Sequence, residues 1–366
     1  MEAVEFDVVG LGYSCIDDLL LLTEIPGPEG RATIRRRERQ GGGMAATALV
    51  AVARLGGRAG FIAKVGDDAI GAQVLADFRR YGVDVSRSVT QPGATSHLTV
   101  VLVDGTSGAR AFLSQRGTVR ELRPDEVDRD YVTSAAVLHL SDATPAAVQA
   151  ARWAKAAGRQ VSFDGTHFHP SFFGLVEHVD YAIVSRFFAS ELVAHREGRD
   201  VGRAARDFAA LALEDDRAAA GAGTAGATHG SPPRPLGPLE HAVSDEAPVH
   251  HGAGEGPLLA GEQLLDAAER LRRLGPAVAA VTEGERGCWC VAPEGRFHVP
   301  AFPVAAVDTT GAGDVFHGAF ALGCARGWGL RRSLAVAAAA AALKCRALGG
   351  RAGIPTLDEA VALVDG

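Results

Sequence analysis

The chain has 366 residues, 47% hydrophobic and 22% charged, with a formal net charge of −7, so it is long and apolar enough to bury a large core. A mildly acidic chain lacks the basic surface that binds nucleic acid or an anionic membrane, and no apolar run is long enough to cross a bilayer. The five cysteines are odd in number and lie mostly in apolar runs, so we expect reduced thiols in a soluble, cytoplasmic protein.

Strand-like and helical patterns alternate along most of the chain. Short apolar runs beside turn residues predict strands at residues 6–12, 59–66, 135–142, 160–165, 180–185 and 277–284. Helical apolar spacing predicts helices at residues 42–56, 69–82 and 144–158. The alternation predicts an α/β three-layer sandwich, in which helices cover both faces of a mostly parallel sheet.

Two kinds of segment interrupt this alternation. Residues of about 13–40 and 95–118 have extended patterns without helices between them, which predicts a small β-sheet that projects from the main domain. Residues of about 216–258 are dominated by Gly, Ala, Pro and Ser and have no apolar period, which predicts a disordered surface insertion. We expect residues 1–366 to form one domain that carries both features.

The segment "DTTGAGDVFHGAF", residues 308–320, carries the strongest chemical signal. It reads as a Gly-rich turn followed by a helix with Asp314 in its first turn. In the simplest interpretation Asp314 only caps the helix. In the functional interpretation the amides of Gly311, Ala312 and Gly313, with the helix dipole, bind an anion. A carboxylate beside that anion then suits phosphoryl transfer, with Asp314 as the base on the acceptor hydroxyl.

Other nucleotide motifs fail. In "GLGYSC", residues 10–15, the third glycine of a dinucleotide fingerprint is replaced by Cys15, and no helix pattern opens after it. No Gly-Lys dipeptide occurs, which excludes a P-loop.

The chain resembles the ribokinase-like (PfkB) family of carbohydrate kinases over its whole length except the insertion. Residues 308–320 match the C-terminal signature of that family, and residues 41–56 with 64–71 resemble its N-terminal one. Residues 281–287 resemble its nucleotide loop and residues 343–355 its C-terminal nucleotide edge. Within the family the motifs look most like sulfofructose kinases and more distantly like ketohexokinases. The resemblance implies that the projecting sheet is a lid, which often also forms a homodimer.

The resemblance assigns roles to individual residues. It makes Asp314 the base, expected to be weak because the helix dipole favours its charged form, and the neighbouring amides the stabilisers of the moving phosphoryl group. Asp17 is expected to accept sugar hydroxyls, and Arg116 to face the phosphates from the lid. The residues expected to line the sugar also include Gly42, Gly43 and Thr47, which replaces the family's Asn. The residues expected on the nucleotide side are Ser185, Thr282, Gly284, Gly287 and Gly313.

ATP and Mg²⁺ are the cofactors that the resemblance implies. The family's N-x-x-E is replaced by "SRFF", residues 185–188, so no direct metal ligand is expected there, and Asp164 is the candidate for contact through water. K⁺ is a further candidate cofactor, with Asp308 and Thr310 as its candidate ligands.

The substrate depends on three positions. Arg31, Ser114 and Asp142 align with the residues that surround the sulfonate in sulfofructose kinases, but Asp142 reverses a charge and would repel a sulfonate. A neutral ketose is therefore at least as compatible as a sulfosugar. We expect phosphorylation of a primary hydroxyl of a small sugar, a ketohexose or a sulfofructose-like ketose. A nucleoside kinase of the same fold and a catalytically silent sugar- or nucleotide-binding regulator stay open, as do the sugar, the hydroxyl and the oligomeric state.

Overall fold

The structure is a computed structural model that describes residues 4–107, 109–196 and 258–366. The predicted insertion at 216–258 lies outside these described residues apart from its last position. No helix among the described residues is long and apolar enough to span a membrane.

A nine-stranded sheet forms the middle layer, with strand order β13-β12-β11-β10-β9-β8-β1-β4-β5. Neighbouring strands from β11 to β5 pair in parallel, whereas β12 and β13 are antiparallel at one edge. The strands are β1 (Phe6–Gly12), β4 (Ala59–Gly66), β5 (Val89–Gln91), β8 (Ala135–Leu140), β9 (Gln160–Gly165), β10 (Tyr181–Ser185), β11 (Val278–Thr282), β12 (Cys288–Ala292) and β13 (Gly295–Val299).

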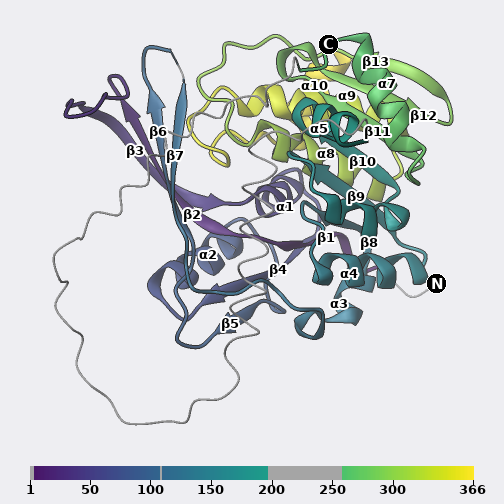
Figure 1. The fold of residues 1–366 in the computed structure, drawn as a ribbon, viewed down its shortest axis with the longest axis horizontal. Helices are drawn as coiled ribbons and strands as arrows, with labels where there is room; N and C mark the ends of the chain where they lie inside the picture. Colours follow the sequence, from purple (N-terminus) through teal and green to yellow (C-terminus); the bar gives the residue numbers. More distant parts are fainter. Residues whose placement is uncertain (1–3, 108, 197–257) are drawn as a thin grey trace.

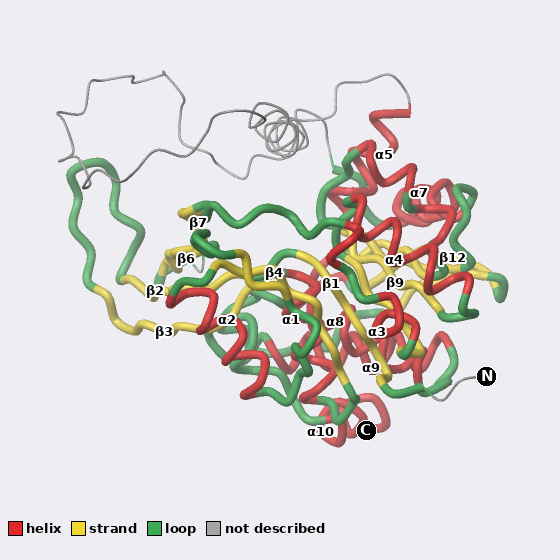
Figure 2. Tube along the Cα trace, turned by 90° about the horizontal axis from the view of Figure 1, so that it is seen from below, coloured by secondary structure: helices red, strands yellow, loops and turns green. Residues whose placement is uncertain are grey.

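Helices cover both faces of this sheet, as the alternating pattern predicts (Figure 2). One core packs the sheet against α1 (Met44–Arg54), α2 (Ala69–Arg80), α8 (Ala312–Ala325), α9 (Leu330–Lys344) and α10 (Leu357–Asp365). The other packs it against α3 (Arg129–Thr133), α4 (Pro145–Ala156), α5 (Arg186–Arg196) and α7 (Glu262–Arg272). The predicted α/β three-layer sandwich is confirmed.

Local sequence signals explain several of the helix starts. Thr144 caps α4 by accepting from the amide of Ala147, and Pro145 occupies the first helical position, where a missing N–H costs nothing. Asp68 caps α2 by accepting from the amide of Gly71. The helix α8 has no such side-chain cap, because it starts on Gly311 in the left-handed conformation. No side chain therefore caps the amides of its first turn.

The second sheet is the lid, with strand order β3-β2-β6-β7. It consists of β2 (Cys15–Leu22), β3 (Ile34–Gly42), β6 (Leu98–Asp104) and β7 (Arg110–Gln115) and projects to the left of the main body in Figure 1. These strands fall in the two segments that the sequence marks as extended, except that β3 continues to Gly42. Leu19, Val101 and Val103 on one lid face pack with Leu348 of the main domain, so this face points toward the body of the protein.

The carboxyl ends of the parallel strands form the edge of the sheet that faces the lid. Asp142 and Asp164 lie at the ends of β8 and β9, and Ser185 and Thr282 end β10 and β11. Ligands of open α/β sheets bind at this edge.

Candidate active site

The N-terminus of α8 lies against the loop that follows α9. Gly311 adopts a φ of 73°, and a Cβ there would lie 2.7 Å from the Cα of Gly350, so only glycine fits. Gly313 has open space at its Cβ position. The amide of Ala312 donates to the carbonyl oxygen of Thr309 at 3.2 Å, so it is engaged within the turn rather than free for an anion, contrary to the sequence-based expectation. The amides of Gly313 and Asp314 have no intrahelical acceptor by position.

Asp314 shares this end of the sheet with other carboxylates. Burial and the nearby Asp164 carboxylate raise the pKa of Asp314 well above its ordinary value, although Arg351 and Lys344 oppose the shift. This direction is opposite to the one expected from the helix dipole. Burial also raises the pKa of Asp142, although the Ser141 hydroxyl opposes this, and burial likewise raises the pKa of Asp17. Asp314 is therefore a stronger base than a helix-start aspartate would ordinarily be.

His317, one turn after Asp314 on α8, holds Asp164. The Nε2 atom of His317 lies 3.1 Å from Oδ1 of Asp164, and both side chains are buried. Behind them the ring of His139 on β8 lies 5.9 Å from that of His317. His139 is fully buried, and burial lowers its pKa to about 3, so this ring is neutral. The Asp164 carboxylate is thus fixed by a histidine that the sequence pattern does not single out.

The glycine segment between β3 and α1 surrounds Asp17. A Cβ on Gly42 would lie 2.3 Å from Oδ2 of Asp17, so Gly42 makes room for that carboxylate. Gly43 has a φ of 101° and lies against the main-chain oxygen of Tyr13. Gly42 therefore brings the backbone close to Asp17, and Gly43 brings it close to the backbone of Tyr13.

Arg351 fastens the same segment to the main domain. Its side chain is almost fully buried and forms an ion pair with Asp77 of α2 at 2.5 Å. Its Nη2 donates to the carbonyl oxygen of Gly42, and its Nε donates to Oγ1 of Thr47 at 3.3 Å. The hydroxyl oxygen of Thr47, expected to face the sugar, therefore accepts a hydrogen bond from a protein group.

A row of polar residues crosses the lid at the level of Asp17. The strand registers pair Asp17 with Gln40 on one side and with Thr99 on the other, and Thr99 with Ser114. Paired residues point to the same face of a sheet. The row lies on the face that packs against Leu348, which faces the active site. Asp17 and Ser114 therefore lie on the same face of the lid, two strands apart.

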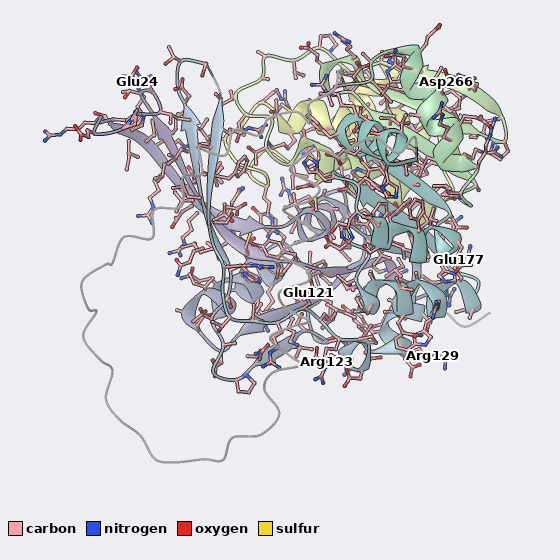
Figure 3. The ribbon with its side chains drawn as sticks, viewed as in Figure 1. Glu24, Glu121, Arg123, Arg129, Glu177 and Asp266 are labelled. Atoms are coloured by element: carbon pink, nitrogen blue, oxygen red, sulfur yellow. The ribbon has the colours of Figure 1, made fainter. Side chains whose placement is uncertain are left out.

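Arg31 is not brought to this row. It is exposed in the connection between β2 and β3, beyond the far end of β2 from Asp17. The six residues from Asp17 to Leu22 alone span about 17 Å. Figure 3 shows Glu24, in the same connection, at the outer tip of the lid. Arg116 directly follows β7, two residues beyond Ser114, and is exposed.

The predicted nucleotide residues cluster at the other half of the edge. Ser185 and Thr282 are direct neighbours across β10 and β11. The hydroxyl of Ser185 donates to the carbonyl oxygen of Thr166 at 2.6 Å and accepts from the amides of Phe187 and Phe188. This side chain therefore caps the start of α5.

A tight loop follows Thr282. Gly284 and Gly287 have φ values of 59° and 93°, and a Cβ on Gly287 would lie 2.1 Å from the carbonyl oxygen of Val299. The buried Glu283 holds this loop through Arg286 and Trp289.

The sequence analysis did not identify four residues that the structure places at the candidate site. They are Gln40, His317, Lys344 and Arg351. A signal existed for Lys344, since it is one of three lysines and ends an alanine-rich apolar helix. The described residues contain no group of three or more His, Cys, Asp or Glu side chains arranged to hold a metal ion.

The fold, the glycine-walled N-terminus of α8 and the carboxylate beside it define the class of a phosphoryl-transfer enzyme. The chain matches the family described as "pfkB family carbohydrate kinase" over residues 7–213 and 255–357, and it belongs to that family. It is therefore a carbohydrate kinase, a phosphotransferase.

Individual relatives span nearly the whole chain. The ATP-dependent ribose-1-phosphate kinase of Halopiger xanaduensis is 28% identical over 360 residues, covering 98% of this chain and 97% of that protein. The 5-dehydro-2-deoxygluconokinase of Shouchella clausii is 25% identical over 374 residues, covering 100% of this chain and 97% of the relative. A putative ribokinase from Agrobacterium tumefaciens has a similar fold, with a TM-score of 0.75 at 24% identity over 98% and 97% of the two chains. These comparisons support the family and give no support to sulfofructose kinases in particular.

Proposed function

We propose that this kinase transfers the γ-phosphoryl group of ATP, bound with Mg²⁺, to a primary hydroxyl of a small, uncharged sugar such as a ketohexose. The observation that carries the proposal is the position of Asp314, in the first turn of α8 beside amides that have no intrahelical acceptor, and near enough to Asp17 of the polar row for their charges to interact. That position puts a base next to a site for the phosphoryl group.

Asp314 is the acceptor of the proton in this mechanism. The sugar hydroxyl attacks the γ-phosphorus, its proton passes to the Asp314 carboxylate, and ADP leaves with the electrons of the broken P–O bond. The raised pKa of Asp314 makes it a better proton acceptor than an ordinary aspartate. The amides of Gly311 and Gly313 would stabilise the charge on the phosphoryl oxygens.

ATP would lie over the end of the sheet at Ser185, Thr282 and the loop of Gly284 and Gly287, with Arg116 reaching its phosphates. A structure of a putative ribokinase II from E. coli in complex with ATP and Mg²⁺ has the same fold. A bound Mg²⁺ would neutralise phosphate charge, and Asp164 would contact it through water, because His317 fixes that carboxylate at the edge.

The charges of the sugar site favour an uncharged substrate. The carboxylates of Asp17 and Asp142 can accept hydrogen bonds from sugar hydroxyls. Asp142 forms no ion pair among the described residues, and it accepts a hydrogen bond from the Ser141 hydroxyl. Arg31, which could have balanced a sulfonate, lies at the far end of the lid. An anionic group placed next to Asp142 would therefore be repelled.

A homodimer through the lid is part of the proposal. Ile34 and Leu113 on the lid are each 53% exposed. Large exposed apolar side chains on one sheet support an interface there.

The test is an ADP-release assay with ATP and Mg²⁺ over fructose, ribose, sulfofructose, ribose 1-phosphate, 5-dehydro-2-deoxygluconate and adenosine. We expect turnover of an uncharged sugar, and a loss of about 10²- to 10⁴-fold in kcat for Asp314→Asn. That variant should keep its thermal midpoint, because it removes a carboxylate whose ionised form is destabilised by burial. The matched control is Asp266→Asn, at an exposed ion pair with Arg296 on the side of the protein away from the lid (Figure 3).

Other outcomes of this assay would contradict the proposed substrate or the proposed mechanism. Preferential turnover of ribose 1-phosphate, the gluconate or sulfofructose would contradict the uncharged substrate. Preference for adenosine would indicate a nucleoside kinase, and ATP binding without any turnover would indicate a silent regulator. Undiminished turnover in Asp314→Asn would contradict the mechanism.

A further inference from the structure

The turn before α8 is built on the Asp308 carboxylate. Its Oδ1 accepts from the amide of Thr310 at 2.9 Å and from the Thr310 hydroxyl at 2.7 Å. Its Oδ2 accepts from the amide of Gly349 at 2.8 Å. These bonds connect the turn to the loop that follows α9 and leave Gly311 and Asp314 directly downstream. Whatever fixes Asp308 therefore also fixes the catalytic end of α8.

Lys344, the last residue of α9, is fully buried against this turn. Its Nζ donates to the main-chain oxygen of Asp308 at 2.9 Å. The other two lysines, Lys64 and Lys155, instead form ion pairs with the carboxylates of Glu126 and Asp180. A buried ammonium group is costly unless polar partners replace its water. The surroundings of Lys344 are a main-chain carbonyl and a nearby carboxylate, which are donors that also bind alkali cations.

A K⁺ ion does not fit here. The residues expected to bind K⁺ are Asp308 and Thr310, and each already contacts a side-chain cation of this chain. Lys344 bonds to Asp308, and Nη1 of Arg110, from the lid, donates to Oγ1 of Thr310 at 2.9 Å. A third positive charge at the same turn would be repelled by both.

We propose that the ammonium group of Lys344 acts as a built-in monovalent cation, which holds the turn before α8 in place of K⁺ and makes the kinase independent of added monovalent cations. An ammonium group carries the same charge as K⁺. Because it is tethered to α9, it is present at every turnover, whatever the salt. Lys344 is thus a positioning residue, which acts on Asp314 through Asp308 and the backbone that joins them.

The test compares the wild type with Lys344→Ala and Lys344→Gln at constant ionic strength in KCl, NH₄Cl, LiCl or choline chloride. One readout is the thermal unfolding midpoint, and the other is ATP- and sugar-dependent ADP release, which alone rests on the proposed function. We expect the wild type to respond equally to KCl and choline chloride in both readouts. The alanine variant in choline chloride should lose about 10- to 100-fold in kcat. KCl and NH₄Cl should restore part of this loss and raise the midpoint, whereas LiCl should not.

The control is Lys155→Ala, which removes a lysine from the surface and should leave the salt response as in the wild type. The proposal is wrong if K⁺ activates or selectively stabilises the wild type. It is also wrong if the folded variants keep full activity in choline chloride, or if K⁺ and NH₄⁺ stabilise neither of them. Should the alanine variant not fold, the glutamine variant, which keeps the bulk without the charge, decides the question. If no sugar is turned over, the proposed function fails, while the thermal readout still tests the cation.

Discussion

Asp314 is subject to two opposing electrostatic effects. The dipole of α8 stabilises its ionised form, whereas burial and the Asp164 carboxylate stabilise the protonated form, and together they raise its pKa. The helix effect is worth roughly 0.3–1 kcal/mol at an exposed helix end, and desolvation in a buried site outweighs it. In the proposed mechanism, a carboxylate that takes a proton from a sugar hydroxyl benefits from the raised pKa.

A pH profile tests this electrostatic balance. Because Asp314 must be ionised to act as the proposed base, kcat/KM should fall as the pH drops through its raised pKa, above the ordinary aspartate value of about 4. Asp164→Asn removes a like charge yet keeps an oxygen that can accept from Nε2 of His317. This change should move the acid limb to lower pH. Asp266→Asn serves as the control, and a limb that stays in place or rises in Asp164→Asn would show that Asp164 does not set the pKa.

At the scale of elements, the junction of β3 and α1 joins the lid to the main domain. Arg351 reaches this junction from the loop after α9 and contacts β3, α1 and, through Asp77, α2. A buried charge that loses its partner is strongly destabilising. The guanidinium group therefore ties three elements together.

Replacing Arg351 by Met should lower the free energy of unfolding by about 3–5 kcal/mol, because the Asp77 carboxylate is left without its partner. Denaturant unfolding measures the loss. The comparison variant is Arg332→Met, since Arg332 is 47% exposed and pairs with Asp365 on the surface, where such pairs contribute about 0–1 kcal/mol. Equal losses in the two variants would contradict the role assigned to Arg351.

The same junction presents Gly42 to Asp17. Gly42→Ala places a methyl group 2.3 Å from the present position of Oδ2 of Asp17. This distance is too short for two unbonded atoms, so Asp17 must move. We expect the KM for the sugar to rise about 10- to 100-fold, while the KM for ATP stays unchanged. Gly174→Ala is the matched control, because nothing lies within 4 Å of its Cβ position. A sugar KM that is unaffected by Gly42→Ala would exclude Asp17 from the sugar site.

At the scale of the whole molecule, much of the architecture could be predicted, because it depends on local patterns. Alternating apolar runs indicate six of the nine strands of the main sheet and several of its helices, and the two extended segments indicate the lid. The motif residues Gly311 and Asp314 were also found, since their chemistry is contained in one short segment. The engagement of the Ala312 amide and the raised pKa of Asp314 were not, because they depend on turn geometry and on burial.

The contacts of Lys344 and Arg351 could not be read from the sequence for a related reason. Lys344 bonds to Asp308 at a separation of 36 residues, and Arg351 bonds to Gln40 at a separation of 311 residues. No local periodicity encodes such pairs. The alignment placed Arg31 at the substrate, whereas the lengths of the lid strands place it in the connection at the lid tip.

The row of polar residues across the lid has a consequence for folding. Its members come from two hairpins, and the pairing of β2 with β6 joins residues about 80 positions apart, such as Asp17 and Thr99. Contacts of such long range form slowly, because chain closure must come first. The row is therefore completed only once the segment between its two hairpins has folded, and a chain emerging from the ribosome cannot form it until β7 is made.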